Sequence, residues 1–450
     1  MRILQILLFP LQGSGSGSYA DRLAGFEQAR GHTVKVLCCD HGVSRRSYET
    51  AALVFKDDGS DRRMEFAPAE RFRRSSTCAD VEPTVRAGGH GGFSPQARDF
   101  ESPAPNTDLD FNFPAFTTHP LSTATTFGSL SADQRERYVV AFRRKIQEEV
   151  ALFKPDIVHA HHGWVISAAL ADLAVPYVIS LHGTEHYGFL HYPAYRELAL
   201  KGLCQADRVL ALTEVERVKA IETYGLDPDR VRVITSGVDT TLFRPHLIDR
   251  RQALTRYSIS EFDRPMVFAG SKLTAIKGAA VLLHAAAIYA RRPERPLTLI
   301  AGEGDERPHL EALCAELKLC DEVIFLGHQN AAQMVELYNL ANVTVLASRT
   351  DWFPLVVIES LACGTPVIAS EVGGLSQLVT SNVGRLFSAG DYATLAAHVT
   401  DFIRSDFKAT AWSVCVEHVR EKFGWNTTVE RIIAVYQDVL REHAKVTRCA

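Results

Sequence analysis

Short apolar runs alternate along the first part of the chain with segments in which apolar residues recur every three or four positions. Residues 3–9 predict a buried strand, residues 11–18 a loop, residues 19–30 an amphipathic helix that ends at Gly31, and residues 33–38 a second strand. A strand, a helix and a second strand in this order form a βαβ unit, which implies a parallel sheet.

The same alternation resumes in the middle of the chain. The stretch Ser131-Ala132-Asp133-Gln134 is typical of a capping box, and it predicts a helix that runs to residue 153 and ends before Pro155. Further strands are expected at residues 157–159, 177–181, 208–212 and 231–234, with helices between them. A parallel α/β domain is therefore predicted for the first half.

A second series of strands and helices begins at Met266. Apolar runs in VFAG, TLIAGEG, VIFLG and VTVLAS predict strands, a helix is expected from about Gly278, and an amphipathic helix is predicted at residues 427–441. Since strands alternate with helices twice over, the fold class predicted is α/β with two doubly wound domains.

Composition narrows the class of protein. With 450 residues the chain is long enough for two or three cores, and its net charge of −4 argues against a nucleic-acid partner. The nine cysteines include no CxxC pair, which indicates reduced thiols and a cytoplasmic protein. No apolar stretch is long enough to span a bilayer, so the only membrane association left open is a peripheral contact at the inner face. Residues 68–128 are rich in Arg, Gly, Ser, Pro and Thr and predict an irregular insertion.

The stretch TDWFPLVVIES, residues 350–360, combines two acids with an apolar run. A strand ends at Ser348, and Pro354 is expected at the first position of a helix because its missing N–H would be unpaired there. The helix should end near Gly364, before a new strand at Val367. The pattern therefore places residues 349–353 in a loop at the carboxyl end of a strand.

The start of that helix is a candidate anion site. The N–H groups of Leu355 and Val356 are available to a diphosphate, and Glu359 lies one turn deeper on the same face, where it can accept hydrogen bonds from a ribose diol. Asp351 in the loop can reach a group beyond the phosphates. The structural alternatives are a capping role for Asp351 and a solvated helix-edge position for Glu359.

Other stretches of the second half carry compatible chemistry. Lys272 and Lys277 follow a strand and can neutralise a diphosphate leaving group, although lysines in such a loop are more often simply at the surface. A glycine pair in AGEG, flanking Glu303, predicts a tight turn where backbone can approach a ligand. His328 ends the strand of IFLGH, which is in a position to pack against a base and is also a buried strand.

Taken in order, the motifs resemble those of the retaining glycosyltransferases of family 4, which have the GT-B fold. The stretches that carry the resemblance are the N-terminal Gly-rich loop, DIVHAHH, LHG, ADRVLALT, ITSGVD…FRP, GSKLTAIKG, AGEG, VIFLGH, DWFPLVVIES, ACGTPVIAS and VGG. They cover residues 1–40 and 131–440, and the insertion has no counterpart among them. The resemblance implies two Rossmann-like domains facing a central cleft: residues 1–245 for the acceptor, residues 246–424 for the nucleotide sugar, and residues 425–450 as a helix crossing back to the first domain.

The resemblance also implies roles for individual residues. It assigns Glu359 to the ribose hydroxyls, Asp351 to sugar hydroxyls near the reacting carbon, and His182 to a position near the donor sugar. The catalytic residues expected are His182, Lys272, Lys277 and Asp351, and the donor-binding residues are Gly15, Gly17, Gly302, Glu303, Gly304, His328, Phe353, Leu355, Val356 and Glu359. The repeated GSGS stretch around Gly15 is also typical of a flexible linker, but its place inside a βαβ unit favours a role beside the diphosphate.

Several positions depart from the pattern of the family. Asp351 replaces the usual Glu, and Trp352 stands where a Gly usually follows that acid. Lys272 replaces an Arg and lacks its planar fork for phosphate. Ser236 replaces an Asn, and Gln377 replaces a Glu after VGG. These differences concern the donor sugar rather than the fold.

The function expected is transfer of a sugar, with retention, from a nucleoside diphosphate sugar to an acceptor hydroxyl, which is the activity of a hexosyltransferase. A UDP-sugar donor and a front-face mechanism, in which the leaving phosphate takes the acceptor proton, follow from the resemblance. Metal independence is expected because no Asp-x-Asp metal motif is placed for this role, and no cofactor is expected. The alternatives are a GT-B nucleotide-sugar epimerase and a non-catalytic nucleotide-sugar-binding partner protein. The acceptor stays open between an envelope lipid, an exported polysaccharide and a small natural product, and the insertion is expected to shape its site. The oligomeric state also stays open.

Overall fold

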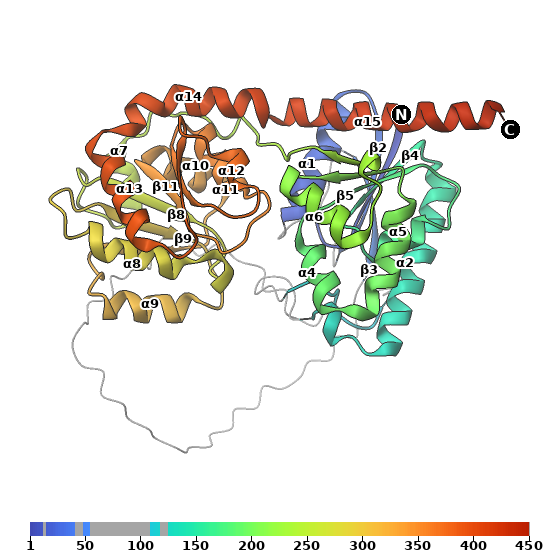
Figure 1. Cartoon of the computed structure of the whole chain (residues 1–450), viewed down its shortest axis with the longest axis horizontal. Helices are drawn as coiled ribbons and strands as arrows, with labels where there is room; N and C mark the ends of the chain where they lie inside the picture. The colour runs from blue at the N-terminus through green and yellow to red at the C-terminus, as the bar shows by residue number, and fades with distance from the viewer. Residues whose placement is uncertain (12–14, 41–47, 55–108, 118–124, 450) are drawn as a thin grey trace, which may run out of the picture.

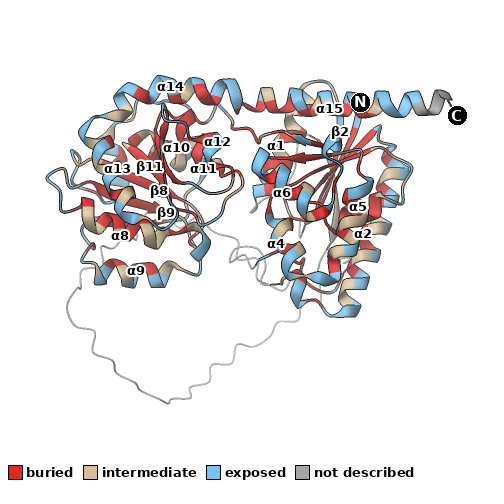
Figure 2. Cartoon of the chain, viewed as in Figure 1, coloured by how far each residue is buried: buried red, intermediate tan, exposed pale blue. Residues whose placement is uncertain are grey.

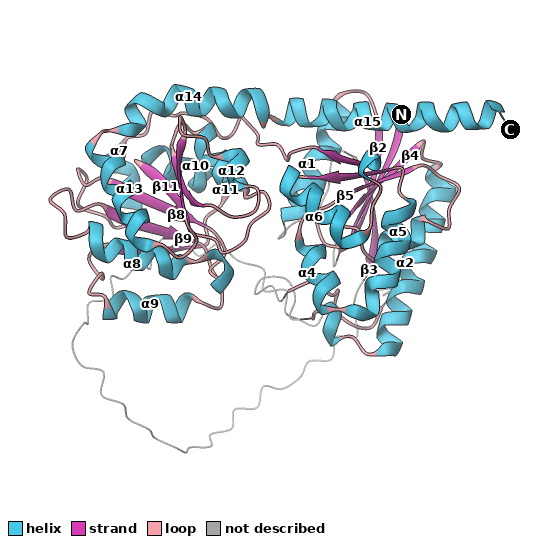
Figure 3. Cartoon of the chain, in the orientation of Figure 1, coloured by secondary structure: helices cyan, strands magenta, loops and turns pink. Residues whose placement is uncertain are grey.

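Two parallel β-sheets, each with helices on both faces, make up the protein (Figures 1 and 3). The computed structural model describes residues 1–11, 15–40, 48–54, 109–117 and 125–449. Within these ranges, the first sheet has the order β3-β2-β1-β4-β5-β6-β7 and the second the order β10-β9-β8-β11-β12-β13. In each sheet the chain first adds strands on one side of its first strand, β1 or β8, and then continues on the other side, as in doubly wound nucleotide-binding folds. The predicted fold class is confirmed.

The N-terminal sheet is built from strands that pair in parallel register, such as Ile3 of β1 with Val34 of β2 and Ile157 of β4. Its strands are β1 (Arg2–Leu7), β2 (Thr33–Asp40), β3 (Glu49–Val54), β4 (Ile157–His161), β5 (Tyr177–Ser180), β6 (Arg208–Ala211) and β7 (Val231–Val233). The helices of this half are α1 (Gly15–Ala29), α2 (Ala132–Phe153), α3 (Val165–Leu170), α4 (Thr184–His191), α5 (Arg196–Gln205) and α6 (Glu214–Tyr224). Strand β3 at the edge was not predicted from the sequence.

The second sheet and its helices follow the same plan. The strands are β8 (Met266–Gly270), β9 (Leu297–Ala301), β10 (Val323–Gly327), β11 (Val343–Leu346), β12 (Val367–Ser370) and β13 (Gly384–Phe387). The helices are α7 (Arg250–Arg256), α8 (Ala279–Tyr289), α9 (Arg307–Glu316), α10 (Ala331–Leu340), α11 (Leu355–Ala362), α12 (Leu375–Leu378), α13 (Tyr392–Arg404), α14 (Phe407–Lys422) and α15 (Trp425–Cys449). Figure 2 shows that the strands of both sheets are buried, because helices cover both of their faces.

Local signals account for most boundaries. Ser131 caps α2 in a capping box with Gln134, as predicted, and α2 ends at Phe153 before the left-handed Lys154. The predicted loop at residues 11–18 is wrong over residues 15–18, because α1 already begins at Gly15. Ser16 and Gly17 are buried in its first turn, and this tertiary packing outweighs the poor helix propensity of glycine.

The end of the predicted insertion packs into the N-terminal core, although its described residues 109–117 form neither a helix nor a strand, as the predicted irregular segment requires. Phe111, Phe113, Phe116 and Phe127 are each at most 9% exposed, and they join the same apolar cluster as the strands. Burial of aromatic rings contributes strongly to core stability. Residues 55–108 and 118–124 lie outside the described residues, so the expectation that the insertion shapes the acceptor site stays untested.

The C-terminal helix α15 packs on the N-terminal domain. Figure 1 shows α14 above the second domain and α15 running on above the first. Val429, Ile432 and Tyr436 of α15 are fully buried in a cluster that includes Ile3 and Ile157 of the first sheet. The N–H of Val238, in the first connection between the domains, donates to the carbonyl oxygen of Phe423 in the second at 2.8 Å. The two connections therefore lie side by side and form the hinge between the domains. None of the described helices is both long and apolar enough to cross a membrane.

Candidate active site

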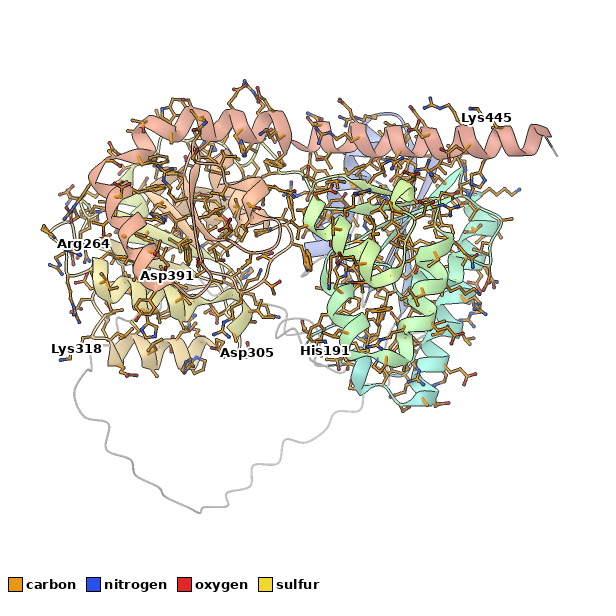
Figure 4. All side chains as sticks on the ribbon, in the orientation of Figure 1. His191, Arg264, Asp305, Lys318, Asp391 and Lys445 are labelled. Carbon is orange, nitrogen blue, oxygen red and sulfur yellow. The ribbon has the colours of Figure 1, made fainter. Side chains whose placement is uncertain are left out.

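Loops at the carboxyl ends of the strands of the two domains meet. The loop that follows β11 and the turn that follows β12 contact residues after β5 and β6: Trp352 lies against Gly183, and Gly374 lies against Thr213. The N–H of Glu214 donates to Oε1 of Gln377 at 3.3 Å. Figure 4 labels Asp305, after β9, and His191, at the end of α4, and shows them on the sides of the domains that face each other. In open α/β sheets, ligands bind at these carboxyl ends.

The loop after β11 carries an ion pair between two of the predicted catalytic residues. Lys277 Nζ lies 2.6 Å from Asp351 Oδ2, and both side chains are shielded, at 28% and 11% exposed. Backbone contacts hold the two segments together: the N–H of Arg349 donates to the carbonyl oxygen of Ile276 at 2.7 Å. A Cβ on Gly278, whose φ is +68°, would lie 2.0 Å from the Ala347 oxygen, so only glycine permits this approach.

Helix α11 begins at Leu355, and Pro354 is its N-cap with an extended backbone rather than its first helical residue, which corrects the prediction. The side chain of Pro354 makes no capping hydrogen bond at this end. Leu355 and Val356 are half-buried against the core, and their backbone is at the helix start where orphan N–H groups attract anions. Gly364, at φ +78°, follows the end of the helix as predicted.

Glu359 lies one turn into α11 and lines a pocket at the hinge. Tyr338 donates its hydroxyl hydrogen to Glu359 Oε2 at 3.1 Å. Burial raises the pKa of Glu359 to about 7, and the Tyr338 hydrogen bond and the charge of Arg22 oppose this increase. The carboxyl group is therefore poised to gain or lose a proton near neutral pH, and it keeps acceptor capacity for a ligand.

The pocket is lined by residues of the N-terminal domain, the C-terminal domain and the C-terminal helix α15. Its lining comprises Ser18, Tyr19 and Arg22 of α1, residues 236–239 and Phe243 of the hinge, Leu355 and Glu359 of α11, and Trp425 of α15. Arg22 is held by Asp239 at 3.0 Å. Sequence reasoning missed Arg22 because its position in α1 carries no motif, and only the tertiary structure brings it to Glu359.

The glycines of AGEG are explained by packing between loops. A Cβ on Gly302 would lie 1.9 Å from the Ser271 oxygen, and one on Gly304 would lie 2.0 Å from the Leu273 oxygen. These glycines therefore let the turn after β9 press against the loop that carries Lys272. Burial lowers the pKa of Lys272, and the nearby charge of Lys277 lowers it further, while Asp305 acts in the opposite direction. The two lysines therefore lie within reach of each other's charge, and each also lies near an acid, Asp305 for Lys272 and Asp351 for Lys277.

The remaining predicted donor-binding residues lie at the edge of the site, in the core or in the first turn of α1. Glu303 pairs with Arg307 at 2.5 Å, and His328 is exposed after β10. Phe353 is only 6% exposed, and its ring lies 5.9 Å from that of Phe423. The Phe353 side chain therefore belongs to the core, and only its backbone is near the helix start. Gly15 is exposed at the first residue of α1, and Gly17 is buried one half-turn later.

His182, the predicted catalytic histidine, ends a buried chain of hydrogen bonds. Its Nε2 lies 3.2 Å from His161 Nδ1, and His161 Nε2 lies 3.2 Å from Gln5 Oε1. Gln5 Nε2 in turn donates to Glu27 at 2.6 Å, and Glu27 accepts from Tyr436 of α15 at 3.0 Å. Because the Gln5 amide donates to Glu27, its oxygen accepts from His161, and a neutral His161 then accepts from His182 Nε2.

Burial holds these rings neutral. It lowers the pKa of both His161 and His182 well below the ordinary value, and the neighbouring histidines lower each further. The backbone N–H of His182 donates to Glu185 Oε1 at 2.8 Å, which fixes the loop. With Nε2–H used internally, Nδ1 is the ring atom left to accept a hydrogen bond from a ligand. Neither Gln5 nor His161 was assigned a role from the sequence: Gln5 lies in no motif, and His161 lies in the DIVHAHH stretch, which shows no partner for it.

Comparisons with known proteins agree with this geometry. The family model described as "Glycosyltransferase Family 4" matches residues 102–242, and the model "Glycosyl transferases group 1" matches residues 257–414. The first match begins at residue 102, so the end of the predicted insertion does have a counterpart in the family, against the expectation from the sequence. A D-inositol 3-phosphate glycosyltransferase from Acidothermus cellulolyticus is 31% identical over 337 residues, which cover 70% of this chain and 74% of the relative.

Solved structures show the same fold. A sucrose-phosphate synthase from Thermosynechococcus elongatus superposes with a TM-score of 0.70 at 19% identity, covering 98% of this chain and 100% of the other. The Anabaena protein HepE, solved in complex with UDP, superposes with a TM-score of 0.69 at 17% identity, covering 97% and 100%. HepE has also been solved in complex with UDP-glucose.

Two facing Rossmann-like domains, with polar side chains gathered at the carboxyl ends of their strands, give the chain the GT-B fold. The matched models and the identity with the Acidothermus relative place it more closely: the chain belongs to glycosyltransferase family 4. These findings favour a transferase over the epimerase and the non-catalytic partner considered from the sequence.

Proposed function

We propose that this glycosyltransferase moves a sugar from a nucleoside diphosphate sugar, with UDP as the nucleotide, to an acceptor hydroxyl with retention at the anomeric carbon. The observation that carries the proposal is the placement of Glu359 one turn behind the start of α11, in the pocket at the hinge, while Lys277 and Asp351 lie together in front of that helix. The UDP and UDP-glucose complexes of HepE, which has the same fold, support the choice of donor.

In this proposal each part of the donor has a defined partner. The ribose diol donates to the Glu359 carboxylate, and the diphosphate meets the start of α11 and the two lysines. Lys277 then exchanges part of its interaction with Asp351 for a phosphate oxygen. Asp351 accepts from sugar hydroxyls on one side, and Nδ1 of His182 accepts on the other.

Catalysis in this proposal rests on charge stabilisation of the leaving diphosphate. Lys272 and Lys277 stabilise the negative charge that develops as the glycosidic bond breaks, and the start of α11 adds its dipole. The departing phosphate oxygen takes the proton of the acceptor hydroxyl on the same face of the sugar, which gives retention. Two lysines and a helix start can supply the countercharge, so we propose that turnover needs no added metal ion and no cofactor.

To test the proposal, purified protein is incubated with UDP-glucose, UDP-galactose or UDP-N-acetylglucosamine, with and without EDTA. Mass spectrometry then measures the released nucleotide, the free sugar and any isomerised donor. Slow hydrolysis of one donor, lost in Glu359→Ala and retained with EDTA, is the expected result. D-inositol 3-phosphate is the first acceptor to add, because it appears in the name of the Acidothermus relative. Formation of an isomerised donor, or loss of turnover with EDTA, would contradict the corresponding part of the proposal.

A further inference from the structure

Trp352 reaches from one domain to the other. It directly follows Asp351 in the loop after β11, and its indole lies on the backbone of Gly183 in the N-terminal domain. A Cβ built on Gly183 would lie 2.1 Å from Cδ1 of Trp352 and 2.8 Å from its Nε1. The indole is also 5.0 Å from the ring of His186. The side chain therefore touches the first turn of α4 across the domain boundary.

The surface that receives the indole is rigid. Gly183 has φ +86° and is the N-cap of α4, so a side chain there would be strained as well as in collision. His186 stacks on Tyr224 with the ring planes 10° apart, and the Tyr224 hydroxyl lies 2.9 Å from His186 Nδ1. These contacts hold the His186 ring in place beneath the indole.

The backbone that presents the indole is equally constrained. A Cβ on Gly374 would lie 2.2 Å from the Trp352 oxygen and 2.3 Å from Cγ2 of Thr213, which belongs to the other domain. The N–H of Gly374 donates to the Asp351 oxygen at 3.2 Å. The loop that carries Asp351 and Trp352 is thus pressed between the turn after β12 and the N-terminal domain.

The two residues in contact are the immediate neighbours of two site residues. Gly183 follows His182, and Trp352 follows Asp351. We propose that Trp352 is a positioning and specificity-determining residue: its indole is a spacer that sets the distance between His182 and Asp351, and so the width of the donor-sugar subsite. The inference rests on the proposed function, in which the donor sugar lies between these two side chains.

The physical reason is that a rigid aromatic ring fixes a separation that flexible side chains do not. The indole has two rotatable bonds and loses little entropy when it is held against Gly183. A glycine, the usual residue at this position by family resemblance, would leave the space between the two loops open. The domains could then close to a range of distances, and the subsite would no longer distinguish sugars by size.

The experiment compares the full-length protein with Trp352→Gly, Trp352→Phe and a matched control, Trp412→Phe, at a residue that is 49% exposed on α14. Three quantities are measured: the Kd for UDP, the kcat and KM for hydrolysis of UDP-glucose and UDP-N-acetylglucosamine, and the radius of gyration from small-angle X-ray scattering without ligand. Because UDP has no sugar, its Kd reports nucleotide binding alone and should not depend on the width of the donor-sugar subsite.

In Trp352→Gly we expect a UDP Kd within about twofold of wild type, a loss of about tenfold or more in kcat/KM for the better donor, and a smaller ratio between the two donors. The radius of gyration should change, because the indole no longer fixes the separation of the domains, and Trp352→Phe should restore most of each property. Unchanged donor kinetics and scattering in Trp352→Gly would overturn the spacer role, as would an equal loss of UDP and UDP-sugar binding. If the wild-type protein binds no nucleotide, the proposed function fails, and the scattering comparison alone then decides whether Trp352 sets the separation of the domains.

Discussion

Lys277 and Asp351 form an ion pair with 2.6 Å between Nζ and Oδ2, at the front of the helix whose start is the proposed diphosphate site. The two residues are 74 positions apart in the chain. Without donor, each therefore neutralises the other. A ligand whose negative charge binds Lys277 weakens this ion pair, and the Asp351 carboxylate can then accept hydrogen bonds from sugar hydroxyls. Donor binding and the release of Asp351 are therefore linked.

Replacing Asp351 by Asn should separate binding from turnover. The Kd for UDP should stay equal or decrease, because a negative charge next to the diphosphate is removed, while kcat for donor hydrolysis should fall by about 10- to 100-fold. Isothermal titration and product analysis measure the two quantities. Lys277→Met should instead weaken UDP binding and lower kcat together, and Lys277→Arg serves as the charge-conserving control. Equal weakening of UDP binding by Asp351→Asn and Lys277→Met would contradict the linkage.

UDP binding should depend on pH through Glu359. Burial raises the pKa of this carboxyl to about 7, and only the ionised form accepts hydrogen bonds from both ribose hydroxyls. Affinity should therefore weaken as the pH falls below about 7, by up to about tenfold per pH unit. Calorimetric titrations between pH 5.5 and 8.5 measure this.

The control for that experiment is Glu359→Gln, which has the same shape and no titrating group. Phosphate ionisation of UDP contributes equally to both proteins, so the difference between their profiles isolates the carboxyl. Parallel profiles for the wild type and Glu359→Gln would show that Glu359 does not bind the ribose in its ionised form.

Two buried carboxyl groups should make the protein less stable as pH rises. Burial raises the pKa of Glu27 and of Glu216 to about 8, from an ordinary value of 4.5. Between those values the unfolded chain has already released protons that the folded protein keeps, so a rise in pH favours unfolding. Thermal midpoints should fall from about pH 5 to about pH 8 and then level off. In Glu216→Gln the decline should be shallower, whereas Glu430→Gln, at an exposed side chain, should follow the wild type.

The buried chain of hydrogen bonds that ends at His182 can be tested by replacing Gln5 and Tyr436 separately. Gln5→Leu removes the acceptor of His161 and a donor to Glu27, so it should lower stability by about 1–3 kcal/mol and alter the ring ¹⁵N shifts of His182. Tyr436→Phe removes the far contact with Glu27 and a 2.6 Å hydrogen bond with His159 Nδ1, but no hydrogen bond of His161 or His182, so it should leave those shifts unchanged. A purely structural role for Gln5 would lower stability without changing the His182 tautomer, and two-dimensional NMR of labelled histidine distinguishes the cases.

Local patterns were sufficient for much of the fold. The βαβ unit at the N-terminus, the capping box at Ser131 and the end of α11 at Gly364 all depend on residues close together in sequence, so periodicity and turn chemistry predict them. The start of α1 was predicted wrongly, and the burial of the aromatic segment around Phe113 was not predicted. In both, packing against distant residues outweighs local propensity.

The sequence by itself determined that the chain folds as two doubly wound α/β domains, and it singled out Asp351, Glu359 and the two lysines as candidate chemistry. These signals are local, since they consist of strand ends, helix starts and charged residues at fixed spacings. Only the tertiary structure decided which of them meet. The pairing of Lys277 with Asp351, the approach of Arg22 to Glu359 and the contact of Trp352 with Gly183 each join loops or helices far apart in the chain. Such contacts are set by the order of strands in each sheet and by the way the domains close on each other, which no local pattern records.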